Sequence, residues 1–581
     1  MLADFDDWLS LGTHGTVIVR DRPPDDTVDV DRSDYKIHCK PETQEGINYE
    51  ALEALSSRPE DLSFWRKQRV YWLSDELGHF SSVSSDKPVI PSDLSMSQVL
   101  QLAGIDNVKR IDAHEYGNVR GWIRIFKVPE DAKRRYRVIK HPADYNRKHG
   151  SDTVEACGNT TRRIARAAIL DAECALALDL AGFFDQFRLP DDVTWHQVFE
   201  VEGTLFRNLR LPMGGRHSTQ VATAATRLLL SFDHPGVRVD VCTDNVRFTG
   251  TRQAVLAAAR TFVGRCRLAR AKLNEIDIDN FSDADLDALI RVKDADFVGE
   301  VYDYADKTIK CRTKHVERLQ LLVDRLRQPL VTGRQLFAPY ALLIYMSETL
   351  GLRLDTHWAA RQFYSERARD FARNHSLWDE PTDLRPPADF HRWVAQALVN
   401  KPASVNRPRT PTTVAIGDAC EMGYAAVICS KDNGSWNVRL IQKAWSENEK
   451  RNLITANSTV SEPEAAVRIA KLVAKSTAGP LLYVTDHQPF VDAVARGYSM
   501  RPDYNSRVRT FRNAQPHGEL QHLAGTKNIA DKFSRFKAFR LTAADTAAAV
   551  TLAEQALAAR DMGACVVGAW EDLVAGGATT F

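Results

Sequence analysis

Two stretches of sequence carry most of the information in this chain: CALALDLAGFFDQF (residues 174–187) and VRVDVCTDNVRF (residues 237–248). Each has an aspartate at the end of an apolar run of strand length, Asp179 in the first and Asp244 in the second. A carboxylate there is unfavourable unless it is paired or coordinates a cation, and two of them can share one Mg²⁺ site. Either aspartate alone would more often be a helix cap or turn residue.

Length and composition indicate an enzyme of several subdomains, since 581 residues exceed one hydrophobic core and 44% of them are apolar. The sequence has no apolar run of membrane-spanning length, and it begins with the acidic MLADFDDWLS, so we expect neither a membrane partner nor a secretory signal. An intracellular location follows. The nine cysteines form no CxxC pair, which favours reduced thiols over zinc sites or disulfides.

The net charge of +1 is not that of a protein that binds nucleic acid mainly by neutralising phosphates. Residues 120–148 are nevertheless rich in Lys and Arg and poor in Asp and Glu. Alone, this cationic segment would be explained as a solvated loop. Its position ahead of residues 174–187 favours a functional role over that explanation.

The order of further motifs suggests a family. RNLRLPMGGRHSTQ (207–220) lies between the two aspartates, and RAKLNEID (270–277) and DFVGEVYDYADKTIKC (296–311) follow them. This series resembles motifs A to E of the reverse transcriptases of gypsy-type and DIRS-type retrotransposons. The resemblance implies an RNA-directed DNA polymerase whose partners are an RNA template, a DNA or RNA primer and deoxynucleoside triphosphates (dNTPs).

In such a polymerase, Asp179 and Asp244 would be catalytic and would bind two Mg²⁺ ions that stabilise the attacking and leaving oxygens. The backbone carbonyl of Leu180 would complete the metal shell. The family has a second aspartate after Asp244, whereas this chain has Asn245, which offers an oxygen without a charge. Weaker metal binding and a preference for Mn²⁺ are therefore expected. Both an active and an inactive polymerase remain open.

The resemblance also assigns nucleotide-binding residues. A hairpin of the polymerase fingers, with the order strand, basic turn, strand, resembles WIRIFKVPEDAKRRYRVIKHPADYNR (122–147). In it, Arg137 would contact the triphosphate as a planar bidentate donor, and Lys127 is a weaker candidate. Phe184 would exclude the ribose 2′ hydroxyl and so select deoxynucleotides. The remaining candidates lie in motifs B and D: Gly214, Gln220 and Lys272.

Downstream, HVERLQLLVDRL places apolar residues on one helical face and predicts a thumb helix. We therefore assign residues 313–400 to thumb and connection helices. Residues 401–411 are expected to be an extended linker, because Pro402, Pro408 and Pro411 exclude a continuous helix.

The segment after the linker predicts antiparallel strands followed by helix, strand and helix. AIGDACEMGYAAVI, SEPEAAVRIAKLV, LLYVTDHQ and HLAGTKNIADKFSR resemble the carboxylate motifs of a retroelement ribonuclease H (RNase H) domain. The resemblance implies that this domain degrades the RNA strand of an RNA–DNA hybrid, with two Mg²⁺ ions activating a water. The catalytic, metal-binding acids would be Asp418, Glu462, Asp486 and Asp531. Glu464 remains the alternative to Glu462.

The expected fold is thus α/β (α+β), a right-hand polymerase of fingers, palm and thumb followed by an RNase H-like mixed-sheet domain. Its expected parts are an N-terminal extension (1–105), fingers and palm (106–312), the thumb and connection (313–400), the linker (401–411), the RNase H-like domain (412–540) and a helical tail (541–581). Two other functions remain open: a decayed or domesticated retroelement protein that binds nucleic acid, and a nuclease alone. The sequence does not indicate the oligomeric state.

Overall fold

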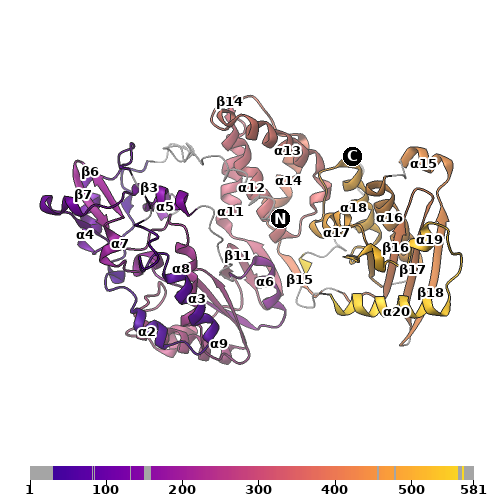
Figure 1. Cartoon of the computed structure of the whole chain (residues 1–581), viewed down its shortest axis with the longest axis horizontal. Coiled ribbons are helices and arrows are strands. Elements are labelled where there is room, and N and C mark those ends of the chain that lie inside the picture. Colours follow the sequence, from indigo (N-terminus) through magenta and orange to yellow (C-terminus); the bar gives the residue numbers. More distant parts are fainter. Residues whose placement is uncertain are drawn as a thin grey trace. The chain divides into compact units, whose positions relative to one another are not determined.

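The structure, a computed structural model, describes residues 31–560 and 566–567, except 82, 84–85, 131–132, 150–158, 408, 433, 454–456 and 477–478. Pro408 and parts of the expected N-terminal extension and helical tail lie outside the described residues. The chain divides into two compact units, Met1–Ala305 and Asp306–Phe581 (Figure 1). Among the described helices, none is both long and apolar enough to cross a membrane.

The first unit combines small sheets with helices. Its main elements, in chain order, are β1 (Lys36–Ile37), α2 (Tyr49–Ala54), α3 (Pro59–Arg69), α4 (Met96–Gly104), β2 (Val108–Arg110), η2 (Ala113–Asn118), β3 (Arg124–Glu130), β4 (Arg135–His141), α5 (Ala143–Lys148), α6 (Arg162–Ala167), β5 (Cys174–Asp179), η5 (Phe183–Gln186), α7 (Asp191–Thr194), β6 (Val198–Val201), β7 (Thr204–Asn208), α8 (Ser218–Leu229), β8 (Val237–Cys242), β9 (Asn245–Gly250), α9 (Arg252–Ala269), α10 (Asp283–Leu289), β10 (Ala295–Phe297) and β11 (Glu300–Asp303).

Three small sheets organise this unit, in the orders β1-β4-β3, β2-β7-β6 and β5-β9-β8. The last, which we call the central sheet, is antiparallel and carries the two strands predicted from the opening sequence stretches. Helices α8 and α9 pack with it around one large apolar core. The predicted hairpin of strand, basic turn and strand is confirmed as β3 and β4, which pair antiparallel.

The described part of the expected N-terminal extension is integrated into the first unit. Strand β1 pairs parallel with β4, and α3 packs against α8 (Figure 1). Trp65 and Trp72, both fully buried, belong to the same core as the central sheet. This packing could not be read from the sequence, because local sequence does not reveal which distant helices the apolar side chains of α2 and α3 cover.

The second unit begins with helices and ends with a larger sheet. Its main elements are β12 (Thr308–Cys311), α11 (Thr313–Arg325), β13 (Val331–Thr332), α12 (Gly333–Leu350), η6 (Leu354–Thr356), α13 (Trp358–Arg373), β14 (Pro381–Thr382), α14 (Ala388–Leu398), β15 (Ala403–Asn406), β16 (Thr413–Ala419), β17 (Gly423–Asp432), β18 (Ser435–Ala444), α15 (Glu447–Leu453), α16 (Ser458–Ser476), β19 (Leu481–Thr485), α17 (Gln488–Arg496), α18 (Pro502–Ala514), β20 (Glu519–His522), η8 (Gly525–Lys527), α19 (Asp531–Ser534), α20 (Ala543–Ala558) and β21 (Val566–Val567).

The helix predicted from HVERLQLLVDRL is confirmed as α11, whose apolar face packs against α12 and α14, while its assignment to a thumb stays a prediction. The predicted linker differs from the structure, because residues 403–406 form β15, which pairs antiparallel with β12. The prolines stand on either side of these four residues and leave their backbone N–H groups able to bond.

The second sheet, which we call the C-terminal sheet, has the order β18-β17-β16-β19-β20. Strands β16 to β18 are antiparallel, and β19 and β20 run parallel to β16. Alternation along the strands gives two apolar faces: α16 and α18 cover one, and α19 and α20 the other. The prediction of an α/β fold with an RNase H-like mixed sheet is confirmed. Helix α20 belongs to this core rather than to a separate tail.

Candidate active sites

The first candidate site lies at one end of the central sheet. Asp179 is the last residue of β5 and pairs with Asn245, the first residue of β9. Asp244 stands in the two-residue turn between β8 and β9, and its carbonyl accepts a 2.9 Å hydrogen bond from the backbone N–H of Leu180. The hairpin register therefore brings Asp179, Asp244 and Asn245 together, as the sequence predicted for a common site.

One oxygen of the Asp179 carboxylate is held by a hydrogen bond, and the other has no such partner among the described residues. Its Oδ2 accepts a 2.5 Å hydrogen bond from Asn274 Nδ2, while its backbone N–H donates to Glu275 Oε2 at 2.9 Å. Its Oδ1 is buried and has no hydrogen-bond partner among the described residues. Burial, followed by the charges of Asp244 and Glu275, raises the pKa of Asp179 to about 6.

This arrangement fits a divalent cation. Burial also raises the pKa of Asp244, and the Asp244 charge contributes to the raised pKa of Asp179, so the site combines two partly desolvated carboxylates that affect each other. An unpartnered buried oxygen is unfavourable, and Mg²⁺ prefers oxygen ligands of this kind. Asn245 is exposed, and its Nδ2 donates a 3.1 Å hydrogen bond to Asp244 Oδ1. Leu180 is buried and forms a bridge with Leu273.

The fingers hairpin separates the two predicted phosphate ligands. Val128 pairs with Arg137, whereas Lys127 pairs with Val138, so Arg137 and Lys127 lie on opposite faces. The Arg137 guanidinium contacts Glu130 and, at 3.8 Å, Met213 Sδ. Its charge opposes the burial that raises the pKa of Asp244.

Lys127 faces another part of the first unit. Its Nζ lies 3.5 Å from Gln98 Oε1 and 5.0 Å from the centre of the Tyr136 ring. The charge of Lys133, in the turn between β3 and β4, is among those that oppose the rise in the pKa of Asp179. The sequence grouped Lys133 with the cationic segment without assigning it to the site.

Three of the other predicted nucleotide-binding residues surround the central sheet. Gly214 N–H donates to the Lys140 carbonyl at 3.2 Å, and a Cβ on Gly214 would lie 3.0 Å from that oxygen, so glycine permits close contact with the fingers hairpin. Phe184, in η5, is half-buried against the core. Gln220 lies half-buried in the first turn of α8.

Lys272 Nζ pairs with Asp279 at 2.9 Å, and its carbonyl accepts from the backbone N–H of Ala181. The residues of the same motif that contact Asp179 are instead Asn274 and Glu275. Sequence reasoning missed both, although a polar pair directly after the apolar Leu273 was the available signal.

The second candidate site lies on the C-terminal sheet. It combines Asp418 from β16, Glu462 from the first turns of α16 and Asp486, which directly follows β19. One ligand oxygen from each lies within 4.8 Å of the others, and Asp418 and Glu462 are buried. Adjacent strands and the helix covering them thus bring together three acids that are 68 residues apart in sequence at most.

Burial dominates the electrostatics of this group. It raises the pKa of Asp418 to about 6 despite a hydrogen bond from Ser534 Oγ, and it raises the pKa of Glu462 well above its usual range. Neighbouring acids add to both shifts. Glu462 Oε1 also accepts a 3.0 Å bond from the backbone N–H of Ala419. Three carboxylates within reach of one another are a donor set that fits a divalent metal.

Asp531 and Glu464 lie beside this trio. Asp531 begins α19 and pairs with Arg535 at 2.7 Å. Burial is the main cause of the raised pKa of Asp418, and the charges of Asp486 and then Asp531 contribute to it. Glu464 pairs with Arg468 at 2.9 Å and with Arg507 at 3.3 Å. Of the two glutamates, Glu462 is thus the one in the acidic trio.

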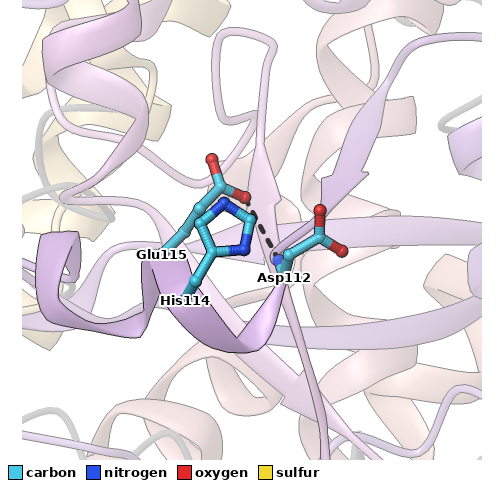
Figure 2. Close-up of side chains that lie close together, drawn as sticks. All are labelled: Asp112, His114 and Glu115. Atoms are coloured by element: carbon cyan, nitrogen blue, oxygen red, sulfur yellow. Dashed lines mark hydrogen bonds between the residues drawn. The ribbon is translucent and has the colours of Figure 1, made fainter.

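A further group of possible ligands, Asp112, His114 and Glu115, lies at η2 in the first unit. Figure 2 shows the Glu115 carboxylate turned toward the backbone nitrogen of Asp112, from which it accepts a 3.1 Å hydrogen bond. This is a capping box, which satisfies the N-terminus of the helix. Asp112 and His114 are exposed, and capping explains the group without a metal.

No family model matches the chain, and no curated protein matches its sequence. Solved structures of foamy viral protease-reverse transcriptase are similar to it at 12–14% identity, each alignment covering 84% of this chain. One, with double-stranded DNA, has a TM-score of 0.40 over 82% of its own chain. Another, with an RNA/DNA hybrid, has 0.41 over 64% of its chain, and a third, with double-stranded DNA, has 0.39 over 99%.

Proposed function

We propose that the chain is the reverse transcriptase of a retrotransposon, which extends a primer on an RNA template with dNTPs and degrades the RNA of the resulting hybrid. The observation that carries the proposal is the meeting of Asp179 and Asp244 at the end of the central sheet, where Asp179 Oδ1 is buried without a hydrogen-bond partner among the described residues. The order of the motifs supports it, and so does a second acidic trio on an RNase H-like sheet.

In the polymerase reaction, Asp179, Asp244 and the oxygen of Asn245 would hold the metal. Two bound Mg²⁺ ions would supply charge stabilisation for the attacking and leaving oxygens. Arg137 and Lys133 would bind the triphosphate, the guanidinium as a planar donor and the ammonium as a point charge. Phe184 would lie against the sugar and exclude a 2′ hydroxyl.

In the nuclease reaction, Asp418, Glu462 and Asp486 would hold the metal, and Asp531 would complete the site from α19. Ser534 would keep the Asp418 carboxylate in one orientation through its hydrogen bond. Asn528, whose Nδ2 donates to the Gly417 carbonyl at 3.0 Å, would fix the strand beneath it.

One observation favours a second candidate, a nuclease with a weakened polymerase. The missing second carboxylate of the β8–β9 turn lowers the negative charge of the first site, and the Asn245 amide is already bonded to Asp244. Under this alternative the C-terminal site would cut hybrids while extension is slow or absent.

An assay with a primed RNA template distinguishes the reverse transcriptase from the nuclease with a weakened polymerase. We expect wild type to extend the primer with dNTPs in Mn²⁺, more slowly in Mg²⁺, and to cleave the hybrid. Asp179→Asn should abolish extension alone, Asp486→Asn should abolish cleavage alone, and Asp233→Asn, at an exposed position, should change neither. Extension by Asp179→Asn at the wild-type rate would contradict the polymerase assignment. Cleavage without extension by wild type would establish the alternative.

A further inference from the structure

An N-terminal segment outside all of the predicted motifs contacts the first candidate site. Residues 38–48 connect β1 to α2 and are anchored at both ends. The backbone N–H of His38 donates to the Tyr136 carbonyl at 2.7 Å, and that of Ile47 donates to the Gln186 carbonyl at 2.9 Å. The segment thus spans from the fingers hairpin to the region directly after Asp179.

Lys40 projects from this segment toward the acids. Its Nζ lies 3.1 Å from Asn274 Oδ1 and 3.2 Å from Glu42 Oε1. Its stem packs beside Gly182, where a Cβ would lie 3.3 Å from Lys40 Cγ. The side chain is 27% exposed, so packing restricts its position while the ammonium remains at the rim of the site. Burial raises the pKa of Glu275, and the Lys40 charge opposes this rise.

The contact with Lys40 sets the orientation of the Asn274 amide. An ammonium only donates hydrogen bonds, so Asn274 must turn its oxygen toward Lys40 and its NH₂ group toward Asp179. The observed 2.5 Å bond from Asn274 Nδ2 to Asp179 Oδ2 is the result. A flipped amide would place NH₂ against the ammonium and oxygen against the carboxylate, and both contacts would be repulsive.

We propose that Lys40 is a positioning residue of the first metal site, acting through Asn274 to hold Asp179 with its Oδ1 free for the metal. The inference rests on the proposed function of Asp179 as a metal ligand. Residues that hydrogen-bond to the ligands of a metal orient those ligands, and loss of such residues typically weakens metal affinity about 10-fold to 100-fold. Lys40 would supply this support from a segment distant in sequence from every motif.

Mn²⁺ binding measured by electron paramagnetic resonance tests the proposal without requiring activity. The full chain carrying Asp418→Asn and Asp486→Asn serves as the parent, so that binding at the C-terminal site does not contribute. In this parent, Lys40→Met should weaken Mn²⁺ binding about 10-fold. Lys40→Arg keeps the charge and donors and should lose less. Lys36→Met, which removes an exposed lysine from β1, just before this segment, should leave binding unchanged.

A double substitution tests whether Lys40 acts through Asn274. If it does, Lys40→Met should cause no further loss of Mn²⁺ affinity once Asn274→Ala is present, because coupled residues are not additive. Full additivity would overturn the proposal. Circular dichroism and thermal unfolding of each variant establish that the fold is retained. A smaller loss of Mn²⁺ affinity in Lys40→Arg than in Lys40→Met supports a role for the charge and donors of Lys40.

Failure of the inference and failure of the proposed function give different results. If the Mn²⁺ affinity of the parent is lost with Asp179→Asn but unchanged with Lys40→Met, only the role of Lys40 is overturned. Parent protein that binds no Mn²⁺, or binds it equally with Asp179→Asn, would overturn the metal site itself and with it both proposals.

Discussion

Removal of the buried charge of Asp418 should stabilise the metal-free protein at neutral pH. Asp418 is 4% exposed, and burial raises its pKa from the ordinary 3.8 to about 6 despite the hydrogen bond from Ser534. The folded state therefore binds the carboxyl proton more tightly than the unfolded chain does. Asp418→Asn removes the ionisable group while keeping an oxygen that can accept a hydrogen bond.

The sign and size of the effect of Asp418 ionisation on the free energy of unfolding follow from proton linkage. Below pH 3.8 the Asp418 carboxyl is protonated in both states, so its ionisation does not affect stability. Between pH 3.8 and about 6 the unfolded chain releases this proton first, so the free energy of unfolding falls as pH rises. Above about pH 6 the loss is complete, and at about 1.4 kcal/mol per pKa unit it amounts to about 3 kcal/mol.

Calorimetric unfolding in EDTA measures this difference. At pH 7.5, Asp418→Asn should raise the free energy of unfolding of the C-terminal sheet domain by about 3 kcal/mol, and at pH 4.5 by roughly 1 kcal/mol. Asp432→Asn, at an exposed position on the same sheet, should change it by less than about 0.5 kcal/mol. Mg²⁺ should stabilise wild type and not the variant. An Asp418→Asn protein equal to or less stable than wild type at pH 7.5 would refute the reasoning.

Three other substitutions are informative. Gly417→Ala would place a Cβ 2.0 Å from Tyr483 Oη, so thermal unfolding should show a loss of about 1–3 kcal/mol, and an unchanged midpoint would contradict the packing. Asp240→Asn would leave the Arg247 guanidinium, 1% exposed, without its partner carboxylate, which should cost about 3–5 kcal/mol by urea denaturation, whereas a neutral effect would show that the pair is dispensable. Phe184→Val should lower the ratio of deoxynucleotide to ribonucleotide incorporation, and an unchanged ratio would show that Phe184 only packs.

The positions of both acidic sites could be predicted because short-range patterns encode them. An apolar run ending in Asp179 and a hairpin turn containing Asp244 specify where each carboxylate stands on its strand, and antiparallel pairing then brings the two strand ends together. In the sequence, Glu462 could be preferred over Glu464 only because Ala465 and Ala466 lie three and four residues after it. The ion pairs of Glu464 with Arg468 and Arg507 give the physical reason for that choice.

The contacts that support these acids could not be predicted, because they join residues far apart in the sequence. Lys40 lies 234 positions from Asn274, and no local pattern records their pairing. Trp65 and the alanines of α20 looked like parts of terminal extensions, although each completes the core of its unit. The hairpin register was needed to show that Lys127 and Arg137 face opposite sides.

Mn²⁺-soaked crystals of the full chain test the central claim most directly, since anomalous scattering locates bound manganese without reference to activity. We predict a peak coordinated by Asp179 Oδ1 and Asp244 in the first unit and another within the Asp418, Glu462 and Asp486 trio. Ordered carboxylates at either site without a manganese peak, in crystals grown at near-neutral pH, would contradict the claim that the acids assemble there to bind metal.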